Sequence, residues 1–236
     1  VLSDGRLEIG LGAGWQVSDY EQSGIPYDRA GVRIDRFLDG LAVIRGALGA
    51  EPFSFSGEHY TVTGYNGLPK PVQQPAPPIL IGGGGPRVLR IAARQADIVQ
   101  LMPSNRGGKA TLDPGQFSPE AIDEKIGWIR EAAGERFAHI ELSAQLLDCT
   151  VTDTPEQHLS DLADRMRGVL RLMGGGDIDL GSDDLRTSPI VAVGSLDEVV
   201  AKLLDTRDRY GITYFAAPID ARPDAIAPVI GALAGA

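Results

Sequence analysis

The sequence predicts an α/β fold built on a parallel sheet, and three observations lead to this class. Strand-like apolar segments alternate with helix-like segments along most of the chain, and such alternation favours parallel strands joined by right-handed crossovers. Several helical segments begin at residues that commonly cap helices. We count five core strands, around Leu7, Ile79, Ile98, Ile140 and Thr213. Five strands are too few to close a (β/α)8 barrel, although 236 residues approach the length of one.

The first part of the chain contains a strand, a helix and a hairpin. In residues 7–12, apolar side chains alternate with other residues and a glycine-rich turn follows, which predicts a strand. Residues 32–48 carry apolar side chains at helical spacing. In residues 50–66, aromatic or aliphatic side chains occupy alternate positions on both sides of a Ser-Gly-Glu turn, which predicts a hairpin insertion. A proline-rich extended stretch leads into the second core strand.

The remainder of the chain alternates regularly between strands and helices. The predicted strands cover residues 79–81, 97–101, 140–151 and 213–218, and the predicted helices cover residues 87–95, 119–133, 155–173 and 223–234, with one more starting at residue 195. Ser118 and Ser195 are expected N-caps, and Glu198 completes a capping box with Ser195.

Two long segments interrupt this rhythm. Residues 103–117 and 174–189 are rich in glycine and polar residues, so we expect mobile loops there, the first of them a candidate lid. We find no fixed repeat and no linker composition, and therefore expect residues 1–236 to form a single domain.

Composition excludes several classes of function. The net charge of −10 argues against nucleic acid or an anionic membrane as the main partner. No apolar run approaches the ~20 residues that span a membrane. The single Cys149 excludes an internal disulfide and fits a reducing, cytoplasmic setting, and its apolar surroundings favour a buried thiol over a nucleophile.

The ionisable residues show no metal or hydrolase pattern. No His, Cys, Asp or Glu cluster has the spacing of metal ligands, so we expect no metal. None of the three histidines, His59, His139 and His158, follows the carboxyl end of a predicted strand, and we expect none to be catalytic. The sequence assigns no catalytic acid or base.

The run Pro-Pro-Ile-Leu-Ile-Gly-Gly-Gly-Gly-Pro-Arg at residues 77–87 is the most informative segment. A short apolar strand ends in four glycines, and a helical pattern with proline at its first turn follows. Such a loop presents backbone amides at the positive end of a helix, which suits a phosphate group. The pattern matches neither the dinucleotide fingerprint nor the P-loop, and a purely structural turn is the alternative.

Three motifs resemble those of luciferase-like monooxygenases, and they occur in the order of that family. They are LSDGRLEIGLGAGW at residues 2–15, LPKPVQQPAPPILIGG at residues 68–83, and VGSLDEV at residues 193–199 followed by Tyr210-Gly211-Ile212. The resemblance covers nearly the whole chain and is strongest to the branch that uses the deazaflavin F420.

This resemblance implies a (β/α)8 barrel of the luciferase-like type, of which the chain contains only strands 4 to 8 with their helices. The first three β/α units would then be absent from the sequence. A barrel without them exposes two sheet edges and an apolar face. We therefore expect either a fragment of a longer protein or partner chains that cover the gap. The resemblance also implies a homodimer.

The resemblance further implies a cofactor site at the carboxyl ends of the strands. The residues expected to contact the cofactor are Gly12, Ala13, Gly14, Trp15, Gly82, Gly83, Gly84, Gly85, Pro86 and Arg87. Residues 82–87 would hold the cofactor phosphate. Relatives often have a serine in this loop that supplies a hydroxyl, and glycines replace it here, so backbone amides would bind the phosphate. For residues 12–15, the alternative to cofactor contact is a tight turn anchored by Trp15.

Substrate contacts are implied at four further positions. These residues are Tyr20, Tyr27, Met102 and Asn105. The aromatic residues and the nearby arginines Arg33 and Arg36 could instead pack the loop that follows the first strand.

The resemblance implies F420-dependent hydride transfer to or from a small organic substrate. An FMNH2-dependent monooxygenase that uses O2 is the alternative within the same family. A non-catalytic barrel paralogue or fragment with an assembly role is an alternative of another class, as is a barrel enzyme that acts on a sugar phosphate without a flavin.

Overall fold

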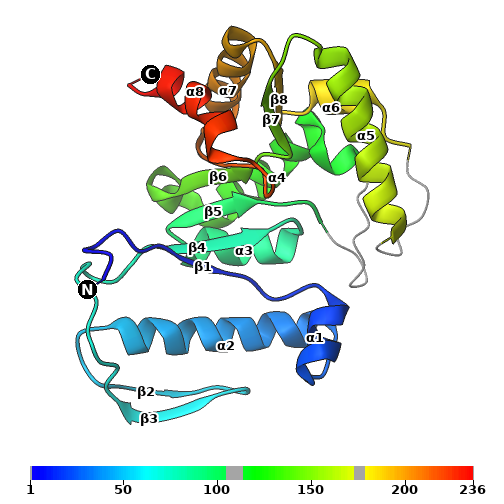
Figure 1. Cartoon of the computed structure of the whole chain (residues 1–236). Coiled ribbons are helices and arrows are strands. Elements are labelled where there is room, and N and C mark those ends of the chain that lie inside the picture. The colour runs from blue at the N-terminus through cyan, green and yellow to red at the C-terminus, as the bar shows by residue number, and fades with distance from the viewer. Residues whose placement is uncertain (1, 105–113, 173–178, 236) are drawn as a thin grey trace. The chain divides into compact units, whose positions relative to one another are not determined.

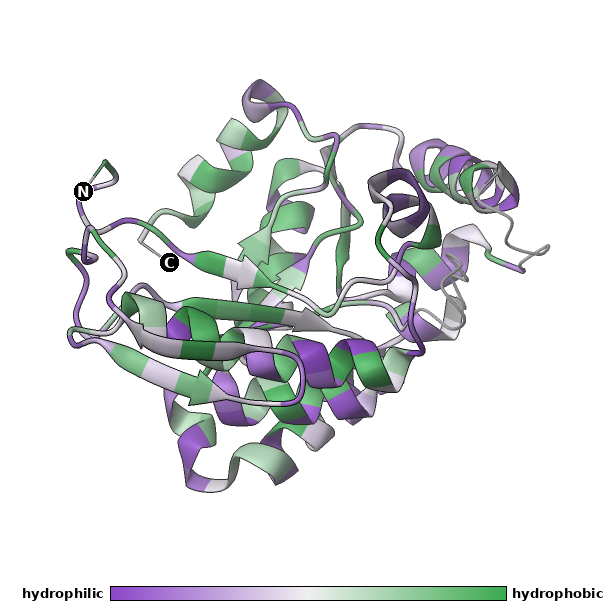
Figure 2. Ribbon diagram, turned by 90° about the horizontal axis from the view of Figure 1, so that it is seen from below, coloured by the Kyte–Doolittle hydropathy of each residue, from purple (hydrophilic) through white to green (hydrophobic). Residues whose placement is uncertain are grey.

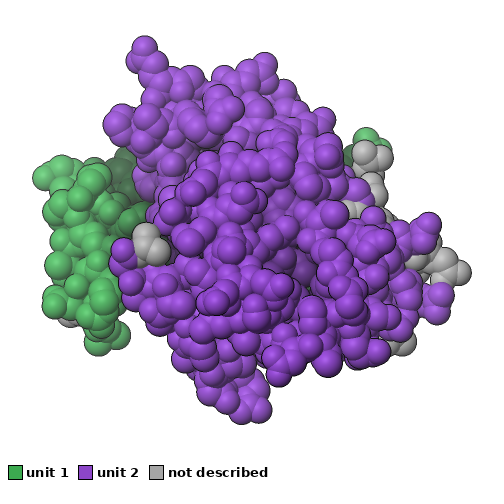
Figure 3. Space-filling view, turned by 90° about the horizontal axis from the view of Figure 1, so that it is seen from above, with its two compact units in different colours: residues 1–81 green, residues 82–236 purple. Residues whose placement is uncertain are grey.

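The computed structural model describes residues 2–104, 114–172 and 179–235 of the chain (Figure 1). The chain divides into two compact units, residues 1–81 and residues 82–236, which Figure 3 shows in different colours. The strands are β1 (Ile9–Leu11), β2 (Phe53–Ser56), β3 (Thr61–Tyr65), β4 (Ile79–Gly83), β5 (Ile98–Leu101), β6 (Glu141–Gln145), β7 (Asp148–Val151), β8 (Val191–Gly194) and β9 (Ile212–Ala216).

The helical elements alternate with these strands as the sequence predicts. The α-helices in the described part of the chain are α1 (Val17–Ser23), α2 (Ala30–Leu48), α3 (Pro86–Gln95), α4 (Pro119–Ala133), α5 (Pro155–Leu172), α6 (Ser182–Thr187), α7 (Leu196–Tyr210) and α8 (Pro223–Leu233). Two 3-10 helices flank α4, namely η1 (Pro114–Phe117) and η2 (Gly134–His139). The α/β class is confirmed.

The first unit joins a parallel strand pair to a helix and a hairpin. Strand β1 runs parallel to β4, with Ile9 opposite Ile79. Strands β2 and β3 are antiparallel and lie within residues 50–66, the predicted hairpin. Helix α2 runs alongside this hairpin and contacts β2 (Figure 1). Leu41 of α2 is buried, so the helix presents an apolar side chain to the interior of this unit.

The second unit carries the end of β4 and then β5, β6 and β9 in hydrogen-bonded order. The pairs β5–β6 and β6–β9 are parallel. A separate parallel pair joins β7 to β8. Helix α3 packs on β5 and lies beside α4, whereas α7 contacts β7, β8 and β9 (Figure 1). The five predicted core strands are therefore all present, and the described residues do not close a barrel.

Apolar side chains on one face of β5 and β6 form the core of the second unit. Val99 lies opposite Leu142 and Leu101 opposite Ala144, and all four are buried. The helices carry both hydrophilic and hydrophobic residues (Figure 2), as expected for helices with one face on a core. A second cluster of buried residues joins α5, α6 and β8, and it includes Leu159.

The helix starts show the predicted caps. The Ser118 hydroxyl accepts a hydrogen bond from the Ala121 amide at 3.2 Å, at the start of α4. At α7, the Glu198 carboxylate accepts from the Ser195 amide at 2.7 Å, and the Ser195 hydroxyl accepts in return from the Glu198 amide. Both predicted N-caps are confirmed.

The prediction of one strand over residues 140–151 is wrong, because the chain changes partners in the middle of that segment. The Leu146 amide donates to Ala216 in β9, at 2.9 Å, whereas the Leu147 amide donates to Ile190, next to β8, also at 2.9 Å. The chain therefore forms two short strands, β6 and β7, in different sheets.

Part of the predicted loop at residues 174–189 is helical. Helix α6 forms there because the Asp184 carboxylate accepts from the Gly181 amide at 2.8 Å and Leu185 is buried. Residues 114–117 of the other predicted loop form η1. Residues 105–113 and 174–178 of these two loops lie outside the described residues. Helix α1 and strand β8 were not predicted at all.

None of the helices in the described part of the chain has the length and apolar character needed to cross a membrane.

Candidate functional site

The glycine loop of the second unit lies at the carboxyl end of β4, where ligands bind in parallel α/β sheets. Gly85 is the N-cap of α3 and Pro86 occupies its first turn. The Met102 amide donates to the Gly83 carbonyl at 3.0 Å. The structure therefore places Met102, a predicted substrate residue, directly beside the loop.

Gly84 is required by a close approach of two backbone segments. A Cβ atom at Gly84 would lie 2.3 Å from the carbonyl carbon and oxygen of Pro103 and 2.5 Å from the Ser104 nitrogen. No side chain fits in that space, because carbon atoms in contact lie ~3.5–4.0 Å apart. The loop that follows β5 thus forms one wall of the glycine loop.

Two backbone donors of the glycine loop lack a partner in the part of the chain that the structure describes. Within the described residues, the amides of Gly84 and Gly85 donate no hydrogen bond. The Gly85 carbonyl, by contrast, accepts from the Leu89 amide at 3.0 Å and begins α3. Unpaired amides at a helix start carry partial positive charge and favour an anion. The geometry therefore fits a phosphate group, whose oxygens accept hydrogen bonds from such amides.

A row of polar side chains crosses β5, β6 and β9, and sequence reasoning missed it. Gln100 lies opposite Ser143, and Ser143 lies opposite Tyr214. A Cβ atom at Gly82 would lie 3.5 Å from the Gln100 Oε1 atom, so the row adjoins the glycine loop. The Ser143 side chain is fully buried, and its hydroxyl has no hydrogen-bond partner among the described residues. Polar residues inside otherwise apolar strands were the available signal.

The first unit brings together most of the residues predicted around the turn after β1. The Tyr27 hydroxyl donates to the Trp15 carbonyl at 3.0 Å, and the Tyr20 hydroxyl contacts the Ala13 carbonyl at 3.5 Å. The two tyrosine rings meet edge to face, with centroids 5.1 Å apart. Gly14 has a φ of 68°, which glycine adopts without strain.

Arg33 holds this turn together. Its guanidinium lies 4.4 Å from the centre of the Tyr27 ring and donates to the carbonyls of Gly14 and Asp28. The tyrosine hydroxyls and Arg33 are thus engaged with the backbone of the turn. This arrangement is the loop-packing alternative, and substrate contact by Tyr20 and Tyr27 stays a prediction.

A small pocket of the first unit, with a volume of about 270 Å³, opens beside Gly12 and Ala13. Arg33 and Arg36 of α2 line it together with Tyr60. Arg36 pairs with Asp28 at 2.5 Å, and this hydrogen bond raises the pKa of the Arg36 guanidinium. The pocket therefore carries positive charge next to predicted cofactor residues.

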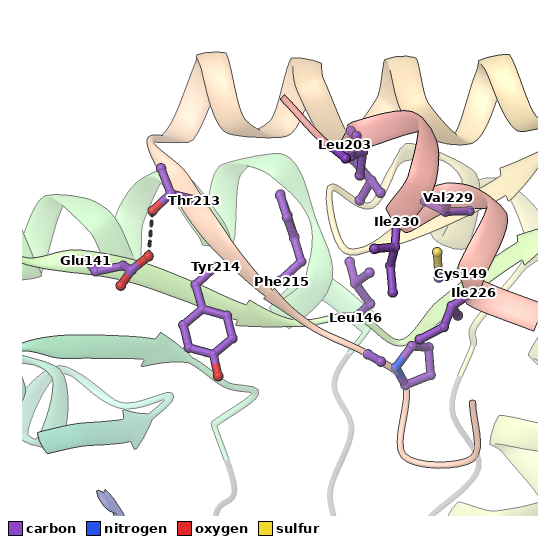
Figure 4. Close-up of a pocket in the computed structure, with 14 residues that line it drawn as sticks. Glu141, Leu146, Cys149, Leu203, Thr213, Tyr214, Phe215, Ile226, Val229 and Ile230 are labelled. Atoms are coloured by element: carbon purple, nitrogen blue, oxygen red, sulfur yellow. Dashed lines mark hydrogen bonds between the residues drawn. The ribbon is translucent and has the colours of Figure 1, made fainter. Parts of the chain in front are cut away.

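The second unit has a larger pocket of about 560 Å³ between β9 and α8 (Figure 4). Most of its lining is apolar, and Phe215 and Val229 are typical. The Thr213 hydroxyl donates to the Glu141 carboxylate at 3.2 Å at one end of it. Burial raises the pKa of the Cys149 thiol, so the sulfur is protonated at neutral pH and a poor nucleophile. This pocket has the chemistry of an apolar binding surface.

His158 makes a local structural contact. Its Nε2 atom lies 3.1 Å from the Asp148 carboxylate, which also accepts from the Thr150 hydroxyl at 2.6 Å. The pair connects α5 to β7, and the absence of a catalytic role for this histidine stays an expectation. Among the described residues, no group of three or more His, Cys, Asp and Glu side chains could hold a metal ion. Asn105, the last predicted substrate residue, lies outside the described residues.

The glycine loop at the carboxyl end of β4 and the polar row beside it form the candidate ligand site of this α/β fold. The chain belongs to the luciferase-like monooxygenase family, whose sequence model matches residues 1–214.

Two curated relatives match part of the chain. An uncharacterized protein of Mycobacterium tuberculosis is 36% identical over 97 residues, which cover 39% of this chain and 31% of the relative. The FMNH2-dependent dimethylsulfone monooxygenase of Pseudomonas putida is 29% identical over 96 residues, covering 41% of this chain and 26% of that enzyme.

Solved structures share the fold. A monooxygenase of Streptomyces bottropensis superposes with a TM-score of 0.66 and 20% identity over 93% of this chain and 63% of its own. The coenzyme F420-dependent tetrahydromethanopterin reductase of Methanopyrus kandleri gives a TM-score of 0.68 and 18% identity over 98% of this chain and 74% of its own. The chain thus spans less than two thirds of the Streptomyces enzyme and a smaller part of the curated relatives.

Proposed function

We propose that this chain acts in F420-dependent hydride transfer to or from a small organic substrate. The observation that supports this proposal is the pair of amides at the start of α3, those of Gly84 and Gly85, which have no hydrogen-bond partner among the described residues. The similarity to an F420-dependent reductase supports the choice of cofactor. Bound F420 would supply the hydride chemistry, and the protein would supply binding and orientation.

In this proposal the two amides bind the cofactor phosphate, with Pro86 and Arg87 at the same helix start. Met102 follows β5 beside the Gly83 carbonyl and would contact the substrate. Gln100 and Tyr214, the partly exposed members of the polar row, would orient the bound molecules, because they project from the same face of the sheet. The cofactor contacts of residues 12–15 are a further part of the proposal.

FMN is the alternative cofactor, and the similarity to an FMNH2-dependent monooxygenase favours it. The chain would then oxygenate its substrate with O2. Both cofactors carry a phosphate, so the glycine loop fits either one.

Titration of the chain with F420 and with FMN, followed by fluorescence, separates these cases. Micromolar binding of F420 without binding of FMN supports the proposal. Binding of FMN without binding of F420 refutes F420 as the cofactor and supports the FMN-dependent monooxygenase. Binding of neither cofactor favours the non-catalytic alternative. We also propose that the chain forms a homodimer, and light scattering of the same sample tests this by measuring the molar mass.

A further inference from the structure

Lys125 is a buried charged residue with no part in the function proposed so far. It lies in the middle of α4 and is 3% exposed, among the buried residues Ile122, Ile126 and Ile129. Burial lowers the pKa of Lys125 from 10.5 to about 8, against a weak opposing effect of Glu124. A buried ammonium group is costly. An apolar side chain would avoid that cost, so the lysine must provide something else.

What Lys125 provides is a hydrogen bond to the turn in front of its own helix. Its Nζ atom donates to the backbone carbonyl of Gln116 at 3.1 Å. Gln116 belongs to η1, whose last residue, Phe117, is 3% exposed. The Ser118 cap and the Lys125 bond together fix how η1 joins α4.

The Gln116 side chain extends this connection to the loop after β5. Its Oε1 atom accepts a hydrogen bond from the Ser104 amide at 3.3 Å. The same amide, with the Pro103 carbonyl, forms the surface that Gly84 approaches so closely that a Cβ atom would lie 2.3 Å away. The peptide between Pro103 and Ser104 is therefore held between Gln116 and Gly84.

We propose that Lys125 is a positioning residue for the glycine loop. Through Gln116 it fixes the 103–104 peptide against which Gly84 rests, and so it sets the direction in which the Gly84 and Gly85 amides point. This inference rests on the proposed function, in which those amides bind a phosphate group. Lys125 itself touches neither cofactor nor substrate.

Lys125→Met tests the proposal, because methionine fills a similar volume without donating a hydrogen bond. Lys202→Met is the matched control: Lys202 on α7 also donates to a backbone carbonyl, that of Arg186, at 3.4 Å. Amide hydrogen exchange of the ligand-free chain is measured by mass spectrometry, with the affinity for F420 and FMN measured alongside.

In Lys125→Met we expect exchange of the Met102, Ser104 and Leu89 amides to accelerate about tenfold while β6 and β9 are unchanged, because these amides donate to the glycine loop or to Gln116 and only this local support is lost. The affinity for whichever cofactor the parent chain binds should fall about tenfold. Lys202→Met should change neither. Gln116→Ala should reproduce the effect, and Gln116→Glu should largely avoid it because a carboxylate still accepts from the Ser104 amide.

Unchanged exchange in the loop would overturn the proposal, and so would acceleration throughout the second unit, since Lys125 would then be a general stabiliser. Faster loop exchange with unchanged cofactor affinity would overturn the link to the amides. If the parent chain binds neither cofactor, the proposed function fails, whereas selective exchange still supports the positioning of the loop by Lys125.

Discussion

Gly84→Ala is the sharpest test of the glycine loop. The new Cβ atom would lie 2.3 Å from the carbonyl carbon and oxygen of Pro103 and 2.5 Å from the Ser104 nitrogen. These atoms belong to backbone, so relief requires the two segments to separate by roughly 1 Å or more to reach van der Waals contact at ~3.5 Å. Gly84 is not among the glycines with positive φ, so the effect is steric alone.

Overpacking of this kind costs about 1–3 kcal/mol, and we expect the free energy of unfolding to fall by that amount. Urea unfolding measures this free energy, with the slope of the transition unchanged. The displaced loop should also bind the cofactor at least about tenfold more weakly, because a shift of this size breaks two aligned hydrogen bonds.

Gly127→Ala is the control for this substitution. Gly127 lies on the exposed side of α4, and a Cβ atom there would meet nothing within 4 Å. Alanine is the better helix former, so this variant should be more stable by about 0.5–1 kcal/mol and bind the cofactor as the parent does. If Gly84→Ala matched the parent chain in both stability and affinity, the close approach of Gly84 to the 103–104 peptide would be refuted.

Three further predictions concern buried polar groups. The folded-state pKa of Lys125, about 8, lies below the unfolded value of 10.5, so the unfolded chain binds more protons between these values and stability should rise with pH across that window by up to about 3 kcal/mol. The difference in free energy of unfolding between the parent and Lys125→Met should show this slope, and parallel pH curves would contradict it. Ser143→Ala removes a buried hydroxyl without a partner among the described residues, so it should raise the free energy of unfolding by about 1 kcal/mol and with it the melting temperature. A lower melting temperature would show that the hydroxyl has a partner. Asp148→Ala leaves Thr150 and His158 without their shared acceptor and should cost about 1–3 kcal/mol in urea unfolding, whereas Asp148→Asn should cost less; equal losses would argue against this reasoning.

Most elements could be predicted because their signals are local. The Ser118 and Ser195 hydroxyls accept hydrogen bonds from amides only three residues away, so the local sequence determines where α4 and α7 begin. The break between β6 and β7 could not be predicted, because the Leu146 and Leu147 amides bond to segments far along the chain. Helix α6 could not be predicted either, because its six residues are too few to show a periodic pattern. It is stabilised by the burial of Leu185, which depends on packing against other segments.

The candidate site divides in the same way. The glycine loop could be predicted from composition alone, because four consecutive glycines between a strand and a helix leave amides accessible. The polar row could not, because the register that places Gln100, Ser143 and Tyr214 side by side depends on how the crossovers pack. The contacts of Arg33 with Gly14 and Tyr27 likewise required the folded turn.

The sequence by itself determined the α/β class, the family and the place of the glycine loop, since each depends on short-range periodicity, on capping residues or on contiguous motifs. Only the tertiary structure decided why Gly84 must lack a side chain and why a lysine is buried in α4. Both features result from close contacts between segments that are separated along the chain. The energies of such contacts depend on packing and on the exclusion of water, which cannot be predicted from a local pattern of residues.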